Sequence, residues 1–323
     1  MKTNALGPLG QVSRLTLGGG GIGHIWGPSS REESIATIHA ALDGGIDLID
    51  TAPMYGNCEA IIGETFGGKL PAHVRITTKC FLGSPAANEV EEKLTQSLEA
   101  SLAAMELDRV DVLFLHSNIC ENNYVYAVRP DLRDSFATTW PLYTERFIPA
   151  AEKLKAQGKI GMWAITGTGV PATILRALTH TQKPAIVQAM ANLMDSAGAL
   201  RRYAETAQPR AIIAKAKENG VGVMGIRAVQ AGALTAQIDR SLSENHPETK
   251  DYDRAAPFRE LCKRMGQDPA VMAHRYAMSM EGVDTVVLGV KNRAELAQCL
   301  EGERLGTLTT DEMKAIDDLG LRV

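Results

Sequence analysis

The sequence predicts an α/β protein in which eight parallel strands alternate with helices and close into a single (β/α)8 barrel, or TIM barrel. Three observations lead to this prediction. Eight short apolar runs recur along the chain, segments of helical period separate them, and no linker or low-complexity tract divides residues 1–323. Most runs are nearly continuous in Val, Ile and Leu, which is typical of strands buried on both faces of a parallel sheet. We therefore expect one barrel domain.

The predicted elements follow one another at intervals that each leave room for a helix. The eight strands are Leu15–Gly19, Ile46–Thr51, Val74–Lys79, Val110–His116, Gly161–Gly167, Ala185–Met190, Val221–Arg227 and Thr285–Val290. The third helix has an apolar stripe of Val90, Leu94, Leu98, Leu102 and Met105. The first helix is predicted to start after Ser30, which precedes Glu33 by three residues as in a capping box. Gly158 and Gly220 lie between helix and strand, where a left-handed cap is expected.

A glycine-rich segment after the first predicted strand offers an alternative fold. Residues Gly18–Gly23 loosely satisfy the G-x-G-x-x-G pattern of dinucleotide-binding loops, and an acidic residue follows at Asp43 or Asp47. An open, doubly wound sheet would carry its loop at this point. Because eight successive strand-helix units favour the closed barrel, we interpret the glycines as a turn where the backbone passes close to a neighbouring group.

Composition and charge exclude several classes of function. With 45% hydrophobic residues and a net charge of −4, neither nucleic acid nor an anionic membrane is an expected partner. No run approaches about 18 uninterrupted apolar residues, and the start of the chain lacks a signal-peptide pattern. The cysteines are scattered and form no metal-binding motif: Cys58, Cys80, Cys120, Cys262 and Cys299. We expect no metal, no disulfide framework and a cytoplasmic location.

Polar residues occur at the ends of three successive predicted strands, where a buried strand would otherwise be apolar. Asp50 ends the second strand and Tyr55 follows it closely. Lys79 ends the third strand, and His116 ends the fourth. Because all strands of a parallel barrel open their carboxyl ends onto one face, we expect these side chains to converge. Each alone has an ordinary structural explanation, such as a loop cap for Asp50, but the four together indicate a catalytic site.

These four side chains have the chemistry of a proton-donating device. A free tyrosine has a pKa of about 10 and donates its proton reluctantly near neutral pH. The ammonium of Lys79 would stabilise the Tyr55 phenolate, and the Asp50 carboxylate would keep that lysine charged and in place. The imidazole of His116 could hydrogen-bond the substrate oxygen as negative charge develops there. Such a set suits the conversion of a carbonyl to an alkoxide by a hydride donor.

The residues Asp50–Gly56, with the dipeptides that end in Lys79 and His116, closely resemble the catalytic motifs of the aldo-keto reductase superfamily. The resemblance extends over nearly the whole chain, from Ser13 to Lys291. It implies an NAD(P)H-dependent oxidoreductase that reduces a small aldehyde, ketone or sugar carbonyl, or oxidises the alcohol. Tyr55 would be the general acid or base, with Lys79 and Asp50 tuning it. His116 would orient the carbonyl.

The same resemblance implies a nicotinamide cofactor, with NADP(H) favoured over NAD(H). Thr166 and Gln188 would contact the carboxamide, and the loop Arg227–Leu234 would surround the pyrophosphate. All implied cofactor residues are Thr166, Gln188, Arg227, Gly232, Leu234, Gly289, Lys291, Arg293 and Glu295. Lys291 and Arg293 would bind the adenosine phosphate, unless they form a solvated basic turn. The carboxylate at position 295 could repel a 2′-phosphate or accept a hydrogen bond from a ribose hydroxyl.

An unusually long loop, residues 117–143, follows the fourth predicted strand and is rich in aromatic residues: Tyr124, Tyr126, Phe136, Trp140 and Tyr143. Long loops on this face of a barrel are often functional. We expect the aromatic residues to line the substrate pocket, with Tyr126 and Trp140 setting substrate choice. Arg129, Arg133 and Arg146 could instead bind a phosphate or carboxylate. A contact between copies in a homo-oligomer is the alternative use of this loop.

Two other functions remain compatible with the sequence. A lyase or aldolase would use Lys79 as a Schiff-base nucleophile, although a neighbouring Asp50 would keep that lysine protonated and unreactive. A regulatory subunit would bind the cofactor with little turnover, since some potassium-channel β subunits resemble this family. The complete catalytic set argues only weakly against the regulatory subunit. Oxidation of NADPH with a panel of carbonyl compounds would distinguish the three functions.

Overall fold

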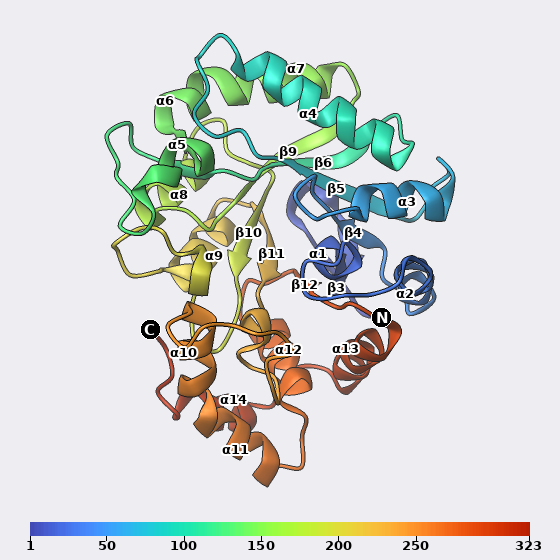
Figure 1. Ribbon diagram of the computed structural model, residues 1–323, viewed down its shortest axis with the longest axis vertical. Coiled ribbons are helices and arrows are strands. Elements are labelled where there is room, and N and C mark those ends of the chain that lie inside the picture. The colour runs from blue at the N-terminus through green and yellow to red at the C-terminus, as the bar shows by residue number, and fades with distance from the viewer.

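Eight strands form a closed barrel at the centre of the structure, a computed structural model that describes all residues from 1 to 323 (Figure 1). Their order around the barrel is β10-β11-β12-β3-β4-β5-β6-β9, and every neighbouring pair is parallel. The strands are β3 (Leu15–Gly18), β4 (Leu48–Asp50), β5 (Arg75–Cys80), β6 (Val110–Leu115), β9 (Ile160–Thr166), β10 (Ile186–Met190), β11 (Gly222–Ile226) and β12 (Thr285–Leu288). The predicted barrel is confirmed, and its closure excludes the open, doubly wound sheet.

Helices follow every barrel strand and form an outer layer around the barrel (Figure 1). They are α2 (Arg31–Asp43), α3 (Cys58–Phe66), α4 (Val90–Met105), α7 (Ile148–Ala156), α8 (Pro171–Leu178), α9 (Pro209–Glu218), α12 (Pro269–Ser279) and α13 (Arg293–Leu305). Three more helices, α10 (Pro247–Arg254), α11 (Ala256–Arg264) and α14 (Thr310–Asp317), lie at the lower end of the view in Figure 1. The predicted apolar stripe of α4 is buried along its whole length. No helix is long and apolar enough to span a membrane.

The start of α2 confirms half of the predicted capping box. The Ser30 hydroxyl accepts a hydrogen bond from the backbone N–H of Glu33 at 3.1 Å. The Glu33 carboxylate does not accept a hydrogen bond from the backbone N–H of Ser30. It accepts hydrogen bonds instead from the backbone and the guanidinium of Arg293, at 2.9 and 2.8 Å. Helix α2 is thereby joined to the start of α13.

The glycine-rich segment after β3 forms a short helix, α1 (Gly19–Ile22), that packs against the end of β12. A Cβ atom at Gly21 would lie 1.9 Å from the carbonyl oxygen of Val290, so a larger residue cannot make this approach. The prediction of a backbone that passes close to a neighbouring group is confirmed.

A β-hairpin that the sequence analysis did not predict closes the barrel at the end where its strands begin. It consists of β1 (Thr3–Ala5) and β2 (Gln11–Ser13), which are antiparallel and flank the 3-10 helix η1 (Gly7–Leu9). The hairpin places the fully buried Leu6 in an apolar layer inside the barrel. The other buried members of this layer are Val12, Leu48, Val112, Phe114, Ala164, Ile186 and Met224.

We expect Leu6→Ala to lower the free energy of unfolding by about 2–5 kcal/mol, because it leaves a cavity in this layer. Leu305→Ala is the matched control, since the Leu305 side chain is exposed and its loss should change stability by less than about 0.5 kcal/mol. Urea unfolding measures both. Equal stability of the two variants would show that the hairpin is not part of the folded core.

The apolar layer also positions the polar residues of the open end. Side chains alternate between the two faces of a strand, so residues two positions apart point the same way. The polar residues that follow the apolar layer at this spacing are Asp50 after Leu48, His116 after Phe114, Thr166 after Ala164 and Gln188 after Ile186. The register pairs Asp50 with Thr77 and Gln188 with Thr166, which brings these strand ends to one level. A polar layer therefore lies directly on the apolar one.

The long connection after β6 is structured along most of its length. It contains a second parallel pair, β7 (Asn118–Cys120) and β8 (Ala137–Thr139), with the 3-10 helix η2 (Pro130–Leu132) and the short helix α5 (Arg133–Phe136) between them. Helix α6 (Trp140–Leu142) and the π-helix η3 (Tyr143–Phe147) then lead into α7. The long loop predicted after the fourth barrel strand is confirmed.

Candidate active site

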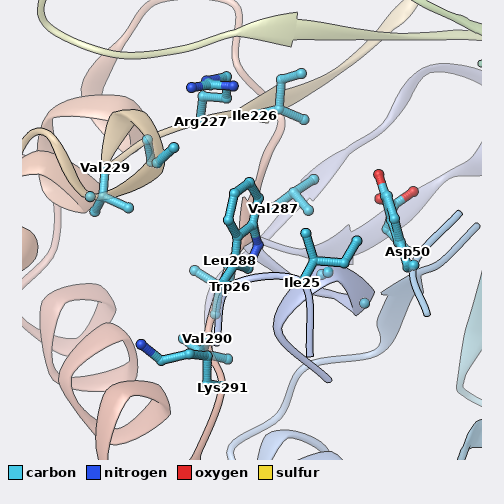
Figure 2. Close-up of a pocket in the computed structure, with 18 of the residues that line it drawn as sticks. Ile25, Trp26, Asp50, Ile226, Arg227, Val229, Val287, Leu288, Val290 and Lys291 are labelled. Atoms are coloured by element: carbon cyan, nitrogen blue, oxygen red, sulfur yellow. The ribbon is translucent and has the colours of Figure 1, made fainter. Parts of the chain in front are cut away.

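A cavity of about 640 Å³ opens among the carboxyl ends of the barrel strands. At one end it is lined by Asp50, Tyr55 and His116, and at the other it reaches Lys291 and Glu295 beside the start of α13. Figure 2 shows Trp26 in the middle of this space, with Asp50 to one side and Lys291 below. The cavity thus joins the predicted catalytic residues to the predicted adenosine end.

Asp50 and Lys79 form a buried ion pair at the base of the cavity. The Lys79 Nζ lies 2.7 Å from Asp50 Oδ2 and donates a second hydrogen bond to the carbonyl oxygen of Thr51 at 2.8 Å. Asp50 Oδ1 accepts hydrogen bonds from the Thr77 hydroxyl at 2.7 Å and from Gln188 Nε2 at 2.8 Å. Both charges are thereby compensated away from water, which is the condition under which a buried pair persists.

Tyr55 is placed over this ion pair by the loop that follows β4. The Lys79 Nζ lies 4.7 Å from the centroid of the Tyr55 ring. The loop packs tightly against the turn after α1, because a Cβ atom at Gly23 would lie only 1.7 Å from the Tyr55 carbonyl oxygen. The backbone of Tyr55 is therefore held by the glycine-rich segment.

Burial and charge act in opposite directions on these groups. Burial raises the pKa of the Tyr55 phenol, and the neighbouring Lys79 ammonium lowers it by a smaller amount. Burial lowers the pKa of Lys79, but Asp50 and Tyr55 outweigh it, so that the pKa lies above its ordinary value and the lysine stays charged. The phenol is thus protonated near neutral pH, with a fixed cation beside it ready to stabilise the phenolate.

His116 lies edge-on to Tyr55, with the ring centroids 5.8 Å apart. Burial, with the nearby Lys79 charge, lowers the pKa of His116 to about 3, so the imidazole is neutral. Its Nδ1 is buried and has no hydrogen-bond partner. The neutral ring lies beside the phenol and lines the cavity, so it can hydrogen-bond a substrate oxygen without itself titrating near neutral pH.

The two residues implied for the carboxamide both line the cavity, and both are also engaged within the protein. The Thr166 hydroxyl donates to the carbonyl oxygens of Leu115 and His116, each at 3.2 Å. Gln188 holds Asp50 through its amide nitrogen, which leaves its carbonyl oxygen as the group that can meet a ligand. Gln188 therefore has a positioning role that the sequence did not reveal.

The loop implied for the pyrophosphate contributes only part of its predicted residues. Arg227 and Gly232 line the cavity, whereas Leu234 is fully buried outside it. The Arg227 guanidinium lies 2.5 Å from the buried carboxylate of Glu248 and donates to Gln230 Oε1 at 2.9 Å. Arg227 has a positive φ of 60°, a conformation that these contacts maintain.

Carboxylates already bind the cations at the adenosine end. Lys291 pairs with Asp239 and lies 3.1 Å from Glu295 Oε1. Arg293 lies outside the cavity wall and pairs with Glu33, whose pKa its hydrogen bonds lower to about 2. The backbone N–H groups of Lys291 and Arg293 donate to Glu295 and Glu33, each at 2.9 Å. Gly289 lines the cavity as predicted.

Trp26 is a cavity residue that the sequence analysis missed. Its indole nitrogen would lie 2.8 Å from a Cβ atom at Gly20, and its ring lies 5.5 Å from the guanidinium of Arg240. An isolated tryptophan in the loop between α1 and α2 carries no pattern in the sequence that would assign it to a site. The other two tryptophans, Trp140 and Trp163, do not line the cavity.

The prediction that Tyr126 and Trp140 line the substrate pocket is wrong. Trp140 packs against Tyr143, with the Arg176 guanidinium 3.9 Å from its ring centroid, and it does not reach the cavity. Tyr126 is buried behind Asn118, whose amide donates to its hydroxyl at 3.1 Å. Asn118 and Phe136 are the residues of this loop that line the cavity.

The arginines of the long loop do not reach the cavity either. Arg129 and Arg133 pair with Asp131 and Asp134, and Arg146 is exposed on η3. A different arginine, Arg202, lines the cavity from the segment between β10 and α9. The sequence analysis did not single it out, because nothing in its local pattern distinguishes it from neighbouring Arg201.

The cavity fits an elongated cofactor with negatively charged phosphate groups. It runs from the Tyr55 and His116 end past the Arg227 guanidinium to the Lys291 ammonium beside the start of α13. Tyr55 and His116, whose rings lie edge to face, mark the end where a reacting group would lie. At this end the protein supplies a proton donor in Tyr55, a fixed cation in Lys79 that stabilises the phenolate, and an imidazole in His116 that orients the substrate.

Comparisons with known proteins find a matching family model, similar sequences and a similar fold. A model of the aldo/keto reductase family matches residues 14–320. L-galactose dehydrogenase of Arabidopsis thaliana is 26% identical over 98% of this chain and 94% of its own, and D-threo-aldose 1-dehydrogenase of a Pseudomonas species is 23% identical over 90% and 89%. The holo form of an aldo-keto reductase from Bacillus halodurans has a similar fold, with a TM-score of 0.70 and 20% identity over 99% and 96% of the two chains.

Proposed function

This chain belongs to the aldo/keto reductase family and is a nicotinamide-dependent carbonyl oxidoreductase, and we propose that Tyr55 is its general acid and base. The observation that carries this assignment is the buried pair of Asp50 and Lys79 directly beneath the Tyr55 ring. The pair supplies a permanent cation next to a phenol that is otherwise reluctant to ionise. No other phenol lines the cavity.

A nicotinamide held in this cavity would supply or accept the hydride, and the protein's own residues would supply or accept the proton. In reduction, the Tyr55 hydroxyl donates its proton to the carbonyl oxygen, and Lys79 stabilises the phenolate that remains. Asp50 keeps Lys79 charged and in place, while Gln188 and Thr77 fix the Asp50 carboxylate. His116 hydrogen-bonds the substrate oxygen and orients the carbonyl. In oxidation, the Tyr55 phenolate accepts the proton of the alcohol.

We propose a sugar or a similar small hydroxycarbonyl compound as the substrate. Two relatives that match this chain over most of its length are named for the oxidation of sugars. The substrate end of the cavity combines the polar side chains of Asn118 and Thr168 with the rings of Phe81 and Phe136. Such a mixture of apolar walls and few polar groups is typical of small-molecule sites.

Steady-state kinetics with aldoses and simple aldehydes, in both directions and with both cofactors, test this function. We expect turnover of at least one aldose or hydroxyaldehyde. A protein that binds the cofactor tightly but turns over no carbonyl or alcohol would instead be a regulatory subunit. The Schiff-base alternative lacks support, because Asp50 holds Lys79 as an ammonium ion, which is not nucleophilic. Trapping of a covalent adduct with Lys79 by borohydride would support the Schiff-base mechanism instead.

We propose that NAD(H) binds at least as well as NADP(H), which departs from the preference predicted from the sequence. That preference required Lys291 and Arg293 to be available to a 2′-phosphate. Asp239, Glu295 and Glu33 instead bind these cations, and a carboxylate here can accept a hydrogen bond from a ribose hydroxyl. An added phosphate would have to displace or approach these carboxylates.

Glu33→Gln should therefore tighten NADPH binding by about tenfold and leave NADH binding nearly unchanged, since a charge-assisted phosphate contact is worth about 1.5–3 kcal/mol. The variant releases Arg293 from its ion pair. Glu32→Gln is the matched control, because Glu32 forms no ion pair with a cation of α13. Quenching of tryptophan fluorescence measures both affinities, and Trp26→Phe should remove most of that signal. Unchanged NADPH affinity in Glu33→Gln would refute the proposed control of cofactor choice.

We also propose a cytoplasmic location. All five cysteines are free and buried. Free thiols without disulfides are typical of the reducing cytoplasm.

A further inference from the structure

One cation of the cavity has no carboxylate and no hydrogen-bond acceptor as a partner within the protein. Arg202 is half-buried and follows the 3-10 helix η4 (Gly198–Leu200). Its guanidinium forms no ion pair, whereas the other cavity cations do: Arg227 with Glu248, Arg240 with Asp239, and Lys291 with Asp239 and Glu295. Arg202 also lacks any side-chain hydrogen bond to a protein group. A cation left unpaired in a largely apolar cavity is available to an anionic ligand.

A continuous series of rings joins Arg202 to the reacting end of the cavity. The Arg202 guanidinium lies 4.3 Å from the centroid of the Phe136 ring. Phe136 lies 4.8 Å from Phe81, and Phe81 lies 5.5 Å from His116, which borders Tyr55. All of these residues line the cavity. A substrate that places its carbonyl at Tyr55 can extend along this wall towards the guanidinium.

The position of Arg202 is fixed from two sides. Its carbonyl oxygen accepts hydrogen bonds from the backbone N–H groups of Ala127 and Val128 at 2.8 and 3.3 Å. The next residue, Tyr203, is buried in a small apolar cluster against which Phe136 also packs. A guanidinium stacked on a ring keeps its N–H edges free for two parallel hydrogen bonds to one anion. The entropy cost of ordering the Arg202 side chain when a ligand binds is then smaller.

We propose that Arg202 determines substrate specificity by binding a carboxylate or phosphate at the end of the substrate distant from the reacting carbonyl. The preferred substrate is then an acidic member of the proposed class, such as a sugar acid or an aldehyde with a terminal carboxylate. This inference rests on the proposed function. Arg202 distinguishes substrates and takes no part in proton transfer.

Matched pairs of substrates test the inference. Butyraldehyde and succinic semialdehyde, glucose and glucuronate, and glyceraldehyde and its phosphate ester each differ by one anionic group. We expect wild-type kcat/KM to favour the anionic member of at least one pair. Arg202→Gln should reduce that preference by about tenfold or more, mainly through KM, because a charge-assisted contact is lost. Arg202→Lys should recover part of this preference, because lysine keeps the positive charge but cannot make two parallel hydrogen bonds to one anion.

Arg129→Gln is the control, because Arg129 pairs with Asp131 on the surface and lies outside the cavity. A preference confined to the carboxylate pairs or to the phosphate pair identifies the anion. Equal losses for both members of every pair in Arg202→Gln would overturn the inference while leaving the proposed function intact. Weaker NADH binding in Arg202→Gln would also overturn it, because Arg202 would then serve the cofactor.

If no substrate is turned over, the proposed function is contradicted. A binding measurement still tests the Arg202 site in that case. Succinate and inorganic phosphate are titrated into the NADH complex by calorimetry. Binding of either anion to the wild-type complex and its loss in Arg202→Gln would support the site. Absence of binding to the wild-type complex, or equal binding to both proteins, would overturn it.

Discussion

Tyr55→Phe is expected to lower the rate of carbonyl reduction by about 10²–10⁴-fold, the usual contribution of a positioned general acid. The change removes only the hydroxyl, so the ring keeps its place above Lys79 and beside His116. Cofactor affinity should be nearly unchanged, because the adenosine end of the cavity lies on other segments. Steady-state kinetics measure the rate, and quenching of Trp26 fluorescence measures the affinity.

Tyr124→Phe is the matched control for this loss. The Tyr124 hydroxyl donates to Glu205 at 2.6 Å on the surface, so its removal changes a phenol of the same protein away from the cavity. We expect wild-type turnover from that variant. Wild-type turnover from Tyr55→Phe as well would remove Tyr55 from the proton-transfer step, and another acid would have to be found.

The barrel and the four converging residues were predictable because both follow from local patterns. A run of β-branched residues marks a strand, and the polar residue at its carboxyl end marks the open face of a parallel barrel. Strand alternation then sets the direction of the side chain: His116 points inward because Phe114 does. The strand pattern alone determines these directions, whichever distant segments meet in the fold.

The adenosine end was less predictable because its properties arise from distant contacts. Glu33 binds Arg293 across 260 positions, and Asp239 binds Lys291 across 52. Glu295, four residues after Lys291, is a local partner, but no local pattern in the sequence reveals the pairing with Asp239 and Glu33. The resemblance to a family implied a phosphate site from the cations alone, and the partners that alter its charge come from α2 and from the loop before α10.

The substrate region shows a second limit of sequence reasoning. Aromatic residues serve both cores and pockets, so the aromatic content of the long loop could not distinguish Trp140, which is buried, from Phe136, which lines the cavity. Arg202 was missed for a related reason, since an arginine is ordinarily a surface residue. Only the fold shows that Arg202 stands at the cavity without a carboxylate beside it.

Lys79→Met is expected to slow alcohol oxidation at neutral pH by about 10²-fold or more, within the range of a general base that is no longer assisted. Oxidation requires the Tyr55 phenolate. Because the Lys79 charge lowers the pKa of Tyr55, its loss should raise that pKa further and move the rise in oxidation rate to more alkaline pH. Reduction, which requires the protonated phenol, should lose rate without a shift of this kind at neutral pH. Measuring kcat/KM against pH in both directions tests the prediction.

The same change should also destabilise the fold, because it leaves Asp50 buried without its cation, at a cost of about 3–5 kcal/mol. The raised pKa of Lys79 fixes the sign of the pH dependence. Its stabilising contribution in the wild type is fully present below the pKa of an unfolded lysine and is lost as pH rises through the higher folded value. The free energy of unfolding of Lys79→Met should therefore not fall in this way at alkaline pH.

The double variant Asp50→Asn, Lys79→Met separates chemistry from folding. Replacing both charges should recover most of the lost stability, because no unpaired charge remains in the barrel. It should not recover the rate, since the cation that stabilises the phenolate is still absent. Recovery of oxidation at the wild-type pH together with stability would mean that Lys79 acts only in the fold and that the Tyr55 phenolate needs no neighbouring charge.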